Sequence, residues 1–285
     1  MKWVNEIENN IVRGHFKKFH PDQVKKYPYT QGQDSALNFI FENLVNENEN
    51  FIKGFAVDIG AGCGFGGSNV RHIVDKYKLN SCELDSFMHL KLSRPHKRNR
   101  YKKLAVESKV QDFIVTKNNI CNKLENDKVH KRYDLLSVDI DSLDWYVIES
   151  MLSGGYIPSV AIVEYNPIFL YNESYVVKYN EDRGKDGTSR YGASLKAYEN
   201  LFKKHNISLV FVFPQREKTG ENDAIFIHND YLDLKYVKDI KELQPDRWVC
   251  KGKKKTGAWI KHHQPEGIKK LVNHYIERGD FICKQ

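Results

Sequence analysis

The stretch that decides the fold lies between residues 57 and 69 and reads Val57-Asp-Ile-Gly-Ala-Gly-Cys-Gly-Phe-Gly-Gly-Ser-Asn69. An apolar run at 55–59 predicts a buried strand before the glycines, and the pattern at 68–77 predicts a helix after them. Glycines let the chain turn tightly and bring backbone N–H groups close to a ligand, and the start of a helix favours negative charge. The stretch therefore predicts a ligand-binding turn between a strand and a helix.

Short apolar runs alternate with helical patterns on both sides of this turn. Expected helices cover 35–46, 68–77, 145–152 and 195–205, and Asp34 or Ser35 is the expected N-cap of the first. Expected strands cover 55–59, 80–83, 110–115, 133–139, 159–164, 207–213 and 223–228. Only Pro214–Asn222 separates the last two strands, which suits an antiparallel hairpin. We expect an α/β fold of Rossmann-like type, with six parallel strands, one antiparallel strand and helices on both faces.

Composition narrows the class of protein further. The 285 residues are 40% hydrophobic and 29% charged, and the mean hydropathy is −0.62, which excludes collagen-like and largely disordered chains. No apolar run approaches the roughly 20 residues of a membrane-spanning helix, and the N-terminus lacks the apolar region of a signal peptide. The five cysteines form no C-x-x-C pair, which argues against a disulfide framework or a zinc ribbon. We expect a cytoplasmic protein with reduced thiols.

The formal net charge of +8 raises nucleic acid as a partner. Residues 245–285 hold ten Lys and Arg against four Asp and Glu, so most of the excess lies there. A second basic cluster covers residues 94–103, where a solvated surface loop is the simpler interpretation. The surplus positive charge therefore lies mainly in these two segments and says little about the ligand of the predicted turn.

Two carboxylates define the kind of ligand that the turn would bind. Glu83 ends the second expected strand, 25 residues beyond Asp58, where a carboxylate can accept both ribose hydroxyls of a nucleoside. Asp58 at the end of the first strand would repel the pyrophosphate of NAD. It suits a ligand with a free ammonium group, such as S-adenosylmethionine.

The ordered motifs resemble a known family. Asp58-Ile-Gly-Ala-Gly-Cys-Gly64 with Glu83 downstream resembles motifs I and II of the class I S-adenosylmethionine-dependent methyltransferases. Further segments resemble the FkbM-like branch, many members of which belong to polysaccharide or natural-product clusters. These segments are Tyr29-Thr-Gln-Gly-Gln-Asp34, Ser68-Asn69, Leu135-Leu-Ser-Val-Asp-Ile-Asp-Ser-Leu-Asp-Trp-Tyr146, Val163-Glu-Tyr-Asn-Pro167, Tyr191-Gly-Ala-Ser-Leu195 and Glu221-Asn-Asp-Ala-Ile-Phe226. The resemblance covers about residues 29–230 and departs at Ser142-Leu143, where Gly-Asn is expected.

The resemblance also implies which residues contact the cofactor. The turn would approach it at Gly60, Gly62 and Gly64. Glu83 would hold the ribose, Asp58 or Asn69 the amino-acid end, and Gln31 the carboxylate of the cofactor. Asn119, just past the third strand, would lie beside the adenine, although an Asn that simply forms a turn is an equal alternative.

Acidic side chains follow two neighbouring expected strands. Asp139 and Asp141 end the fourth strand, and Glu164 and Asn166 end the fifth, at the sheet edge where open α/β folds bind ligands. Asp139, Asp141 and Glu164 could bind Mg²⁺ or Mn²⁺, which would activate an acceptor hydroxyl. Alternatively they contact sugar hydroxyls directly, with Asp139 or Asp141 as the catalytic base. Capping of the next helix by Asp141 or Asp144 is the structural alternative.

A long stretch without periodicity, residues 167–191, indicates a binding loop or lid. It ends at Tyr191-Gly-Ala-Ser-Leu195, where Ser194 is a possible N-cap of the following helix. Tyr191 and Ser194 are candidate substrate residues. The acceptor pocket could also include Tyr165, Tyr171 and Tyr175, whose rings would stack on a sugar, although ordinary packing explains them too.

Three functions of different classes remain open at this stage. The first is O-methylation of a sugar, a sugar-linked intermediate or another small polar metabolite. The second is methylation of RNA or another nucleic acid through the basic clusters, and the third is a cofactor-binding module without catalysis. We expect residues 51–234 to form the methyltransferase domain, 1–50 a helical segment that reaches the cofactor, and 235–285 a basic extension packed on the domain. The oligomeric state stays open.

Overall fold

A computed structural model describes most of the chain. The described residues are 1–12, 15, 18, 32–65, 68–86, 102–140, 142–181, 190–213, 222–244 and 265–284. Gln31, Asp141, the basic cluster up to residue 101 and the basic stretch 245–264 lie outside them. What the sequence predicts for those residues stays a prediction.

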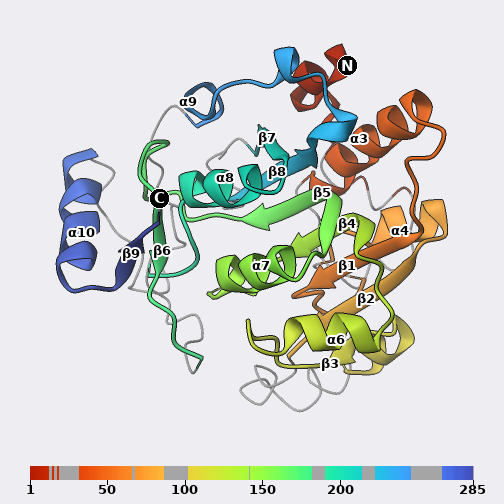
Figure 1. Cartoon of the computed structure of the whole chain (residues 1–285), viewed down its shortest axis with the longest axis horizontal. Helices are drawn as coiled ribbons and strands as arrows, with labels where there is room; N and C mark the ends of the chain where they lie inside the picture. The colour runs from red at the N-terminus through yellow and green to blue at the C-terminus, as the bar shows by residue number, and fades with distance from the viewer. Residues whose placement is uncertain are drawn as a thin grey trace.

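Seven strands form one sheet in the order β3-β2-β1-β4-β5-β8-β7 (Figure 1). They are β1 (Phe55–Ile59), β2 (Asn80–Asp85), β3 (Gln111–Asp112), β4 (Arg132–Val138), β5 (Ile157–Glu164), β7 (Ile207–Val212) and β8 (Asp223–His228). Neighbouring strands are parallel except where β8 pairs antiparallel with both β5 and β7. Six strands thus point one way and one points back. This confirms the predicted Rossmann-like methyltransferase sheet.

Helices cover both faces of the sheet because alternate strand residues are apolar on each face. One core joins the sheet to α6 (Ile120–Asn126), α7 (Asp144–Ser153) and α8 (Leu195–Lys203), and the other joins it to α3 (Gln33–Glu47) and α4 (Arg71–Tyr77). Val57 and Leu136 belong to the first core, whereas their chain neighbours Ala56 and Leu135 belong to the second. The expected layers are therefore present.

The first helix differs from its prediction at its start. Helix α3 begins at Gln33 after Gly32, which has a φ of +117°, so the predicted N-cap at Asp34 or Ser35 is wrong. The Ser35 hydroxyl donates to the Gly32 carbonyl instead and accepts from the Val12 N–H at 2.7 Å. The hydroxyl therefore joins the N-terminal residues to the helix.

The C-terminal residues pair with the long loop that lacked periodicity. The loop contains β6 (Tyr175–Val177), which pairs antiparallel with β9 (Phe281–Cys283). Helix α10 (Pro265–Glu277) precedes β9, and its Ile268 and Val272 belong to the core around α7 and α8. Among the described helices, which also include α9 (Ile240–Leu243) and short 3-10 turns, none is long and apolar enough to cross a membrane.

A buried carboxylate fixes the start of the central strand. Asp134 in β4 is wholly buried and accepts hydrogen bonds from the backbone N–H groups of Lys53, Gly54 and Phe55, the last two at 2.7 and 2.8 Å. These N–H groups lie before β1 or at its first residue and would otherwise lack partners. Asp134 therefore fixes the chain that enters β1 to its neighbouring strand.

We expect Asp134→Asn to lower the free energy of unfolding by about 2–3 kcal/mol, because an amide offers one acceptor oxygen where the carboxylate offers two. Urea denaturation measures the change. Glu125→Gln, on the exposed side of α6, is the control and should stay within about 0.5 kcal/mol of the wild type. Equal stability of the two variants would contradict the role given to Asp134.

Candidate functional site

The glycine turn approaches its neighbours so closely that side chains cannot replace its hydrogens. Gly60, Gly62 and Gly64 have φ values of +90°, +61° and +76°. A Cβ atom on Gly60 would lie 1.8 Å from the carbonyl oxygen of Asp139, and one on Gly64 would lie 2.1 Å from the Oγ of Ser108. The N–H groups of Gly60 and Ala61 both donate to the Leu84 carbonyl at the end of β2. The sequence pattern therefore forms a rigid turn at the carboxyl ends of the central strands.

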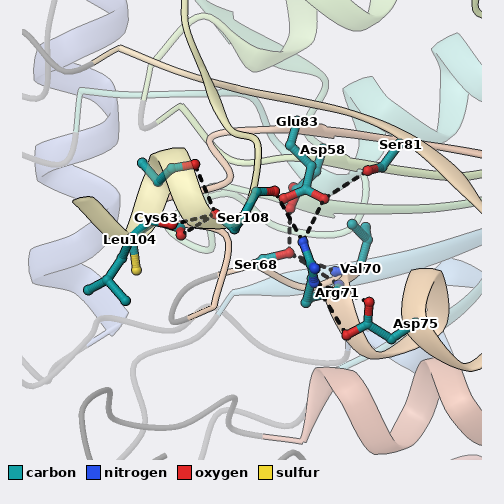
Figure 2. A network of polar contacts seen from close by, with 11 residues as sticks. Asp58, Cys63, Ser68, Val70, Arg71, Asp75, Ser81, Glu83, Leu104 and Ser108 are labelled. Atoms are coloured by element: carbon teal, nitrogen blue, oxygen red, sulfur yellow. Dashed lines mark hydrogen bonds and ion pairs between the residues drawn. The ribbon is translucent and has the colours of Figure 1, made fainter. Parts of the chain in front are cut away.

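Asp58 holds the turn from the side of α4 (Figure 2). Its Oδ2 accepts a 2.7 Å hydrogen bond from the Ser68 hydroxyl, whose oxygen in turn accepts from the N–H groups of Val70 and Arg71 at the start of α4. Burial is the main cause that raises the pKa of Asp58 to about 7; the hydrogen bond from Ser68 opposes it, and the nearby Glu83 adds to it. Asp58 thus joins the end of β1 to the helix that follows the turn.

Glu83 lies beneath the turn rather than beside it. The residue is 2% exposed. Its Oε1 lies 3.5 Å from Nη1 of Arg71 and accepts a 2.9 Å hydrogen bond from the Ser81 hydroxyl. Burial raises the pKa of this carboxyl group. The other carboxylate oxygen, Oε2, is buried and makes no hydrogen bond to a described residue, and the predicted contact of Glu83 with a ribose stays a prediction.

Asp85, two residues further on, is the carboxylate that contacts the turn. Its Oδ2 accepts a 2.9 Å hydrogen bond from the Gly62 N–H, and its side chain is partly exposed. The sequence reasoning missed it because the second strand was expected to end at Glu83. Strand β2 in fact continues to Asp85, which pairs with Asp112 of β3. The last acid of β2 therefore lies at the ligand-binding edge.

Arg71 connects the acid beneath the turn to the segment that covers it. Besides Glu83, its guanidinium lies 3.3 Å from Asp75, donates to the Ser108 carbonyl at 3.2 Å and lies 5.2 Å above the Phe65 ring. The Ser108 hydroxyl donates to the Cys63 carbonyl at 2.7 Å (Figure 2). The turn is therefore held by polar contacts from both α4 and Ser108, which follows the helical residues 102–107.

Two predicted cofactor residues take different positions. The Asn69 amide lies near the turn, 3.5 Å from the Ser137 hydroxyl. Asn119 closes a turn before α6, where its Oδ1 accepts from the Thr116 N–H and its Nδ2 donates to the Ile114 carbonyl. Asn119 therefore has the geometry of the turn-forming alternative, and its contact with adenine stays a prediction.

Acidic residues gather at the adjoining edge of the sheet. Asp139 follows β4 and is exposed, and its backbone N–H donates to the Ile59 carbonyl at 2.8 Å. Glu164 ends β5 opposite Asp223, the first residue of β8. Asp223 also accepts a 2.7 Å hydrogen bond from the Gln33 side chain at the start of α3. The sequence analysis predicted an antiparallel strand here but not its pairing with β5, which brings Asp223 opposite Glu164.

The metal hypothesis gains no support at this edge. Within the described ranges, which include Asp139 and Glu164 but omit Asp141, no three His, Cys, Asp or Glu side chains are placed to hold an ion. Asp144 serves the local fold, since its carboxylate accepts from the N–H groups of Ile140 and Ser142 at 2.8 and 3.0 Å. The role of Asp139, Asp141 and Glu164 as metal ligands therefore stays a prediction.

The candidate substrate residues hold the loop together. Asn166 is wholly buried, and its amide donates to the Tyr191 carbonyl at 2.9 Å. The Tyr191 hydroxyl is 3.3 Å from Nδ2 of Asn222, and its side chain is buried as well. Ser194 is the N-cap of α8, as expected, and its hydroxyl accepts from Ala197 and from Tyr175 in β6. These contacts fix the loop above the ends of β4 and β5.

Three solved structures are weakly similar to the chain. An enzyme described as "A Pericyclic Reaction enzyme" aligns with a TM-score of 0.32, and two LepI structures, one with SAM and one of a variant with SAH and a substrate analogue, align at 0.31. Each is 12% identical and covers 66% of this chain, which spans less than half (46%) of each of theirs. No protein-family model and no curated protein matches the chain. The fold assignment therefore rests on the strand order.

The buried Asp58 predicts a pH-dependent stability. Because its folded pKa of about 7 lies above the usual 3.8, the folded state retains a proton between these values that the unfolded state releases. The contribution of Asp58 to the free energy of unfolding is therefore largest below pH 4 and is lost as the pH rises towards 7. We expect the wild type to lose up to about 1.4 kcal/mol per pH unit in this window relative to Asp58→Asn. Urea titrations of both proteins without ligand, at pH 5 and 7, measure the difference, and parallel stabilities would contradict it.

Proposed function

We propose that the chain is an S-adenosylmethionine-dependent methyltransferase. The observation that most supports this proposal is the hydrogen bond from the Gly62 N–H to Asp85 at the centre of the glycine turn. A dinucleotide-binding turn offers its N–H groups to phosphate, and a carboxylate that occupies one of them repels phosphate. A nucleoside without phosphates fits this turn, and its ribose hydroxyls can donate to the carboxylate.

Asp85 is the residue that we propose for the ribose. It is partly exposed and faces the turn, whereas the Glu83 expected from the sequence is buried against Arg71. Glu83 would then act on the turn indirectly through Arg71. Gly60, Gly62, Gly64 and Asn69 remain the proposed neighbours of the cofactor, and Asp58 supports the turn from within.

The acidic edge supports transfer of a methyl group to a polar acceptor. When bound, S-adenosylmethionine supplies an electrophilic methyl group on a sulfonium. The chain must orient an acceptor oxygen in line with that group and accept its proton. Asp139 is exposed, and its N–H bonds directly to the strand that carries the turn, so it is our candidate for the catalytic base. Glu164, which is partly exposed at the end of β5, is a further candidate acceptor for hydroxyl groups.

A sugar or another small polar metabolite is the acceptor class that we propose, as in the FkbM-like branch. Carboxylates at the strand ends accept hydrogen bonds from hydroxyl groups and repel the phosphates of nucleic acid. Methylation of nucleic acid is the second candidate, favoured by the surplus of positive charge at 245–285. A divalent metal at the edge is an optional part of either proposal.

Calorimetry with S-adenosylhomocysteine tests the cofactor site. We expect Asp85→Asn to weaken binding at least about tenfold, because a carboxylate that accepts ribose hydroxyls contributes more than 1.4 kcal/mol. Glu83→Gln should lower the melting temperature, since Arg71 loses its buried counter-charge, and change the affinity less than Asp85→Asn does. The reverse order of affinities would return the ribose to Glu83. No binding by the wild type would refute the cofactor itself.

Transfer of a labelled methyl group to nucleotide sugars, polysaccharide precursors and RNA tests the acceptor. We expect label in a carbohydrate, and we expect Asp139→Asn to reduce turnover about a hundredfold with little loss of cofactor affinity. Equal loss of both would assign Asp139 to the cofactor pocket. Label in RNA, with binding that falls steeply as salt rises, would support the nucleic-acid function instead. Activity that survives exhaustive chelation would remove the metal.

A further inference from the structure

The C-terminal strand belongs to a ladder of backbone hydrogen bonds that reaches the candidate acceptor site. Strand β6 pairs with β9 along one of its edges (Figure 1). Along the other edge, the Val177 N–H donates to the Gly192 carbonyl at 2.9 Å, and the Ser194 N–H donates to the Tyr175 carbonyl at 2.8 Å. Strand β6 is therefore the middle of three extended segments, and the C-terminal residues form an outer one.

The third segment of the ladder is bonded to the end of the central sheet. The backbone N–H of Asn166, just past β5, donates to the Ala193 carbonyl at 2.7 Å, and the Asn166 amide donates to the Tyr191 carbonyl at 2.9 Å. Asn166 and Ala193 are wholly buried, so water does not compete for these bonds. Residues 190–194, which we call the acceptor segment, thus lie between β6 and the strand ends where we place the methyl acceptor.

An ion pair joins the two outer segments directly. Nη1 of Arg190 lies 3.6 Å from Oδ1 of Asp280, which lies in the turn between α10 and β9. Their side chains are 23% and 15% exposed, so solvent screens the pair only in part. The Asp280 carbonyl also accepts from the Lys178 N–H at 2.9 Å, just past β6. Asp280 therefore contacts both the residue before Tyr191 and the strand beside it.

Aromatic side chains pack behind the ladder. The Phe281 ring in β9 is buried and meets the Phe169 ring edge-on at 4.9 Å between centroids. Phe169 in turn stacks on Tyr175 of β6 at 5.3 Å. Such contacts add buried apolar surface to the hydrogen bonds of the ladder. Strand β9 is therefore packed against the loop as well as paired with it.

We propose that the C-terminal segment, residues 265–284, positions the acceptor segment. Asp280 is the positioning residue, because it holds Arg190 and, next to it, Tyr191. A segment that is bonded on both edges depends on both neighbours, so loss of β9 lowers the local stability of the acceptor segment through β6. The effect on acceptor binding rests on the proposed function, whereas the coupling of the two segments does not.

The sheet order separates this coupling from the cofactor turn. The turn follows β1 and contacts β2, whereas the acceptor segment contacts the end of β5, and β4 lies between β1 and β5. A looser acceptor segment therefore misplaces the methyl acceptor and leaves the proposed cofactor contacts intact. The kinetic consequence is a higher KM for the acceptor with an unchanged affinity for the cofactor.

A proline at Ile282 tests the ladder. Ile282 lies opposite Val176, midway between backbone hydrogen bonds at Asp280 and Lys284, so its N–H faces β6, whereas its side chain is exposed. Ile282→Pro removes this N–H, and the control Ile282→Ala shortens the side chain but keeps the N–H. We expect hydrogen exchange of residues 190–194 to become about tenfold faster in Ile282→Pro and to change less than about twofold in Ile282→Ala.

Two arginines provide a second matched pair. Arg190→Gln and Arg278→Gln each remove a cation that lies 3.6 Å from the Asp280 carboxylate. The Arg278 side chain is 55% exposed, and its ion pair lies within the C-terminal segment. We expect exchange of residues 190–194 to become about threefold faster in Arg190→Gln only, because partly exposed ion pairs are weak, and to recover in Arg190→Lys.

Calorimetry and methyl transfer distinguish positioning from general destabilisation. With UDP-glucose as the acceptor probe, KM should rise about fivefold in Ile282→Pro, whereas the affinity for S-adenosylhomocysteine should stay within about twofold of the wild type. Equal exchange rates in Ile282→Pro and Ile282→Ala, or equal losses of acceptor and cofactor affinity, would overturn the proposal. If the wild type methylates no acceptor, the proposed function fails, and the exchange rates alone decide whether the C-terminal segment holds the acceptor segment.

Discussion

The close contact between Gly60 and Asp139 is the constraint on which the site depends. A Cβ on Gly60 would lie 1.8 Å from the Asp139 carbonyl oxygen, and the Asp139 N–H bonds to the Ile59 carbonyl. The glycine turn and the acidic edge therefore meet through backbone atoms, which no rotamer change can separate. The proposed positions of the methyl donor and of the base that faces its acceptor follow from this one backbone contact.

The turn is also held from below by a partly buried charge pair. Arg71 lies between Glu83 and Asp75 and donates to the Ser108 carbonyl, so one guanidinium joins α4, β2 and the segment that covers the turn. Buried pairs of this kind add little net stability but are costly to break. Here the charge pair holds the geometry of the turn. Arg71 fixes Ser108, and the Ser108 hydroxyl in turn fixes the Cys63 carbonyl. Glu83, which the sequence predicts as a ribose ligand, thus also anchors the guanidinium that holds the turn.

The sequence predicted the parallel sheet because, over most of the chain, apolar strand runs are clearly separated by turn residues and helical patterns. Strands β1 and β8 have the predicted bounds, and Ser194 caps α8 as expected. Helix α6 was missed because only Ile120 and Leu124 are buried in it, too few to give a helical pattern.

The predicted site is less complete, for physical reasons. The ends of strands depend on hydrogen bonds between segments, so the extension of β2 to Asp85 left no local signal. Asp223 joins the acidic edge, and β9 pairs with β6, only through contacts between distant parts of the chain. Asn166 and Tyr191 were predicted from their position, but their burial within the loop depends on packing that no local pattern contains.

The pairing of β6 with β9 has a consequence for synthesis of the protein. Strand β9 lies about a hundred residues after β6 along the chain, so the ribosome makes the loop long before its partner strand. A bridge from Val176 to Ala193 joins β6 to the residues just before α8. Until β9 is made, the other edge of β6 is unpaired and can associate with other chains. The loop above the acidic edge is therefore among the last parts of the nascent protein to become ordered, and the sheet beneath it can form first.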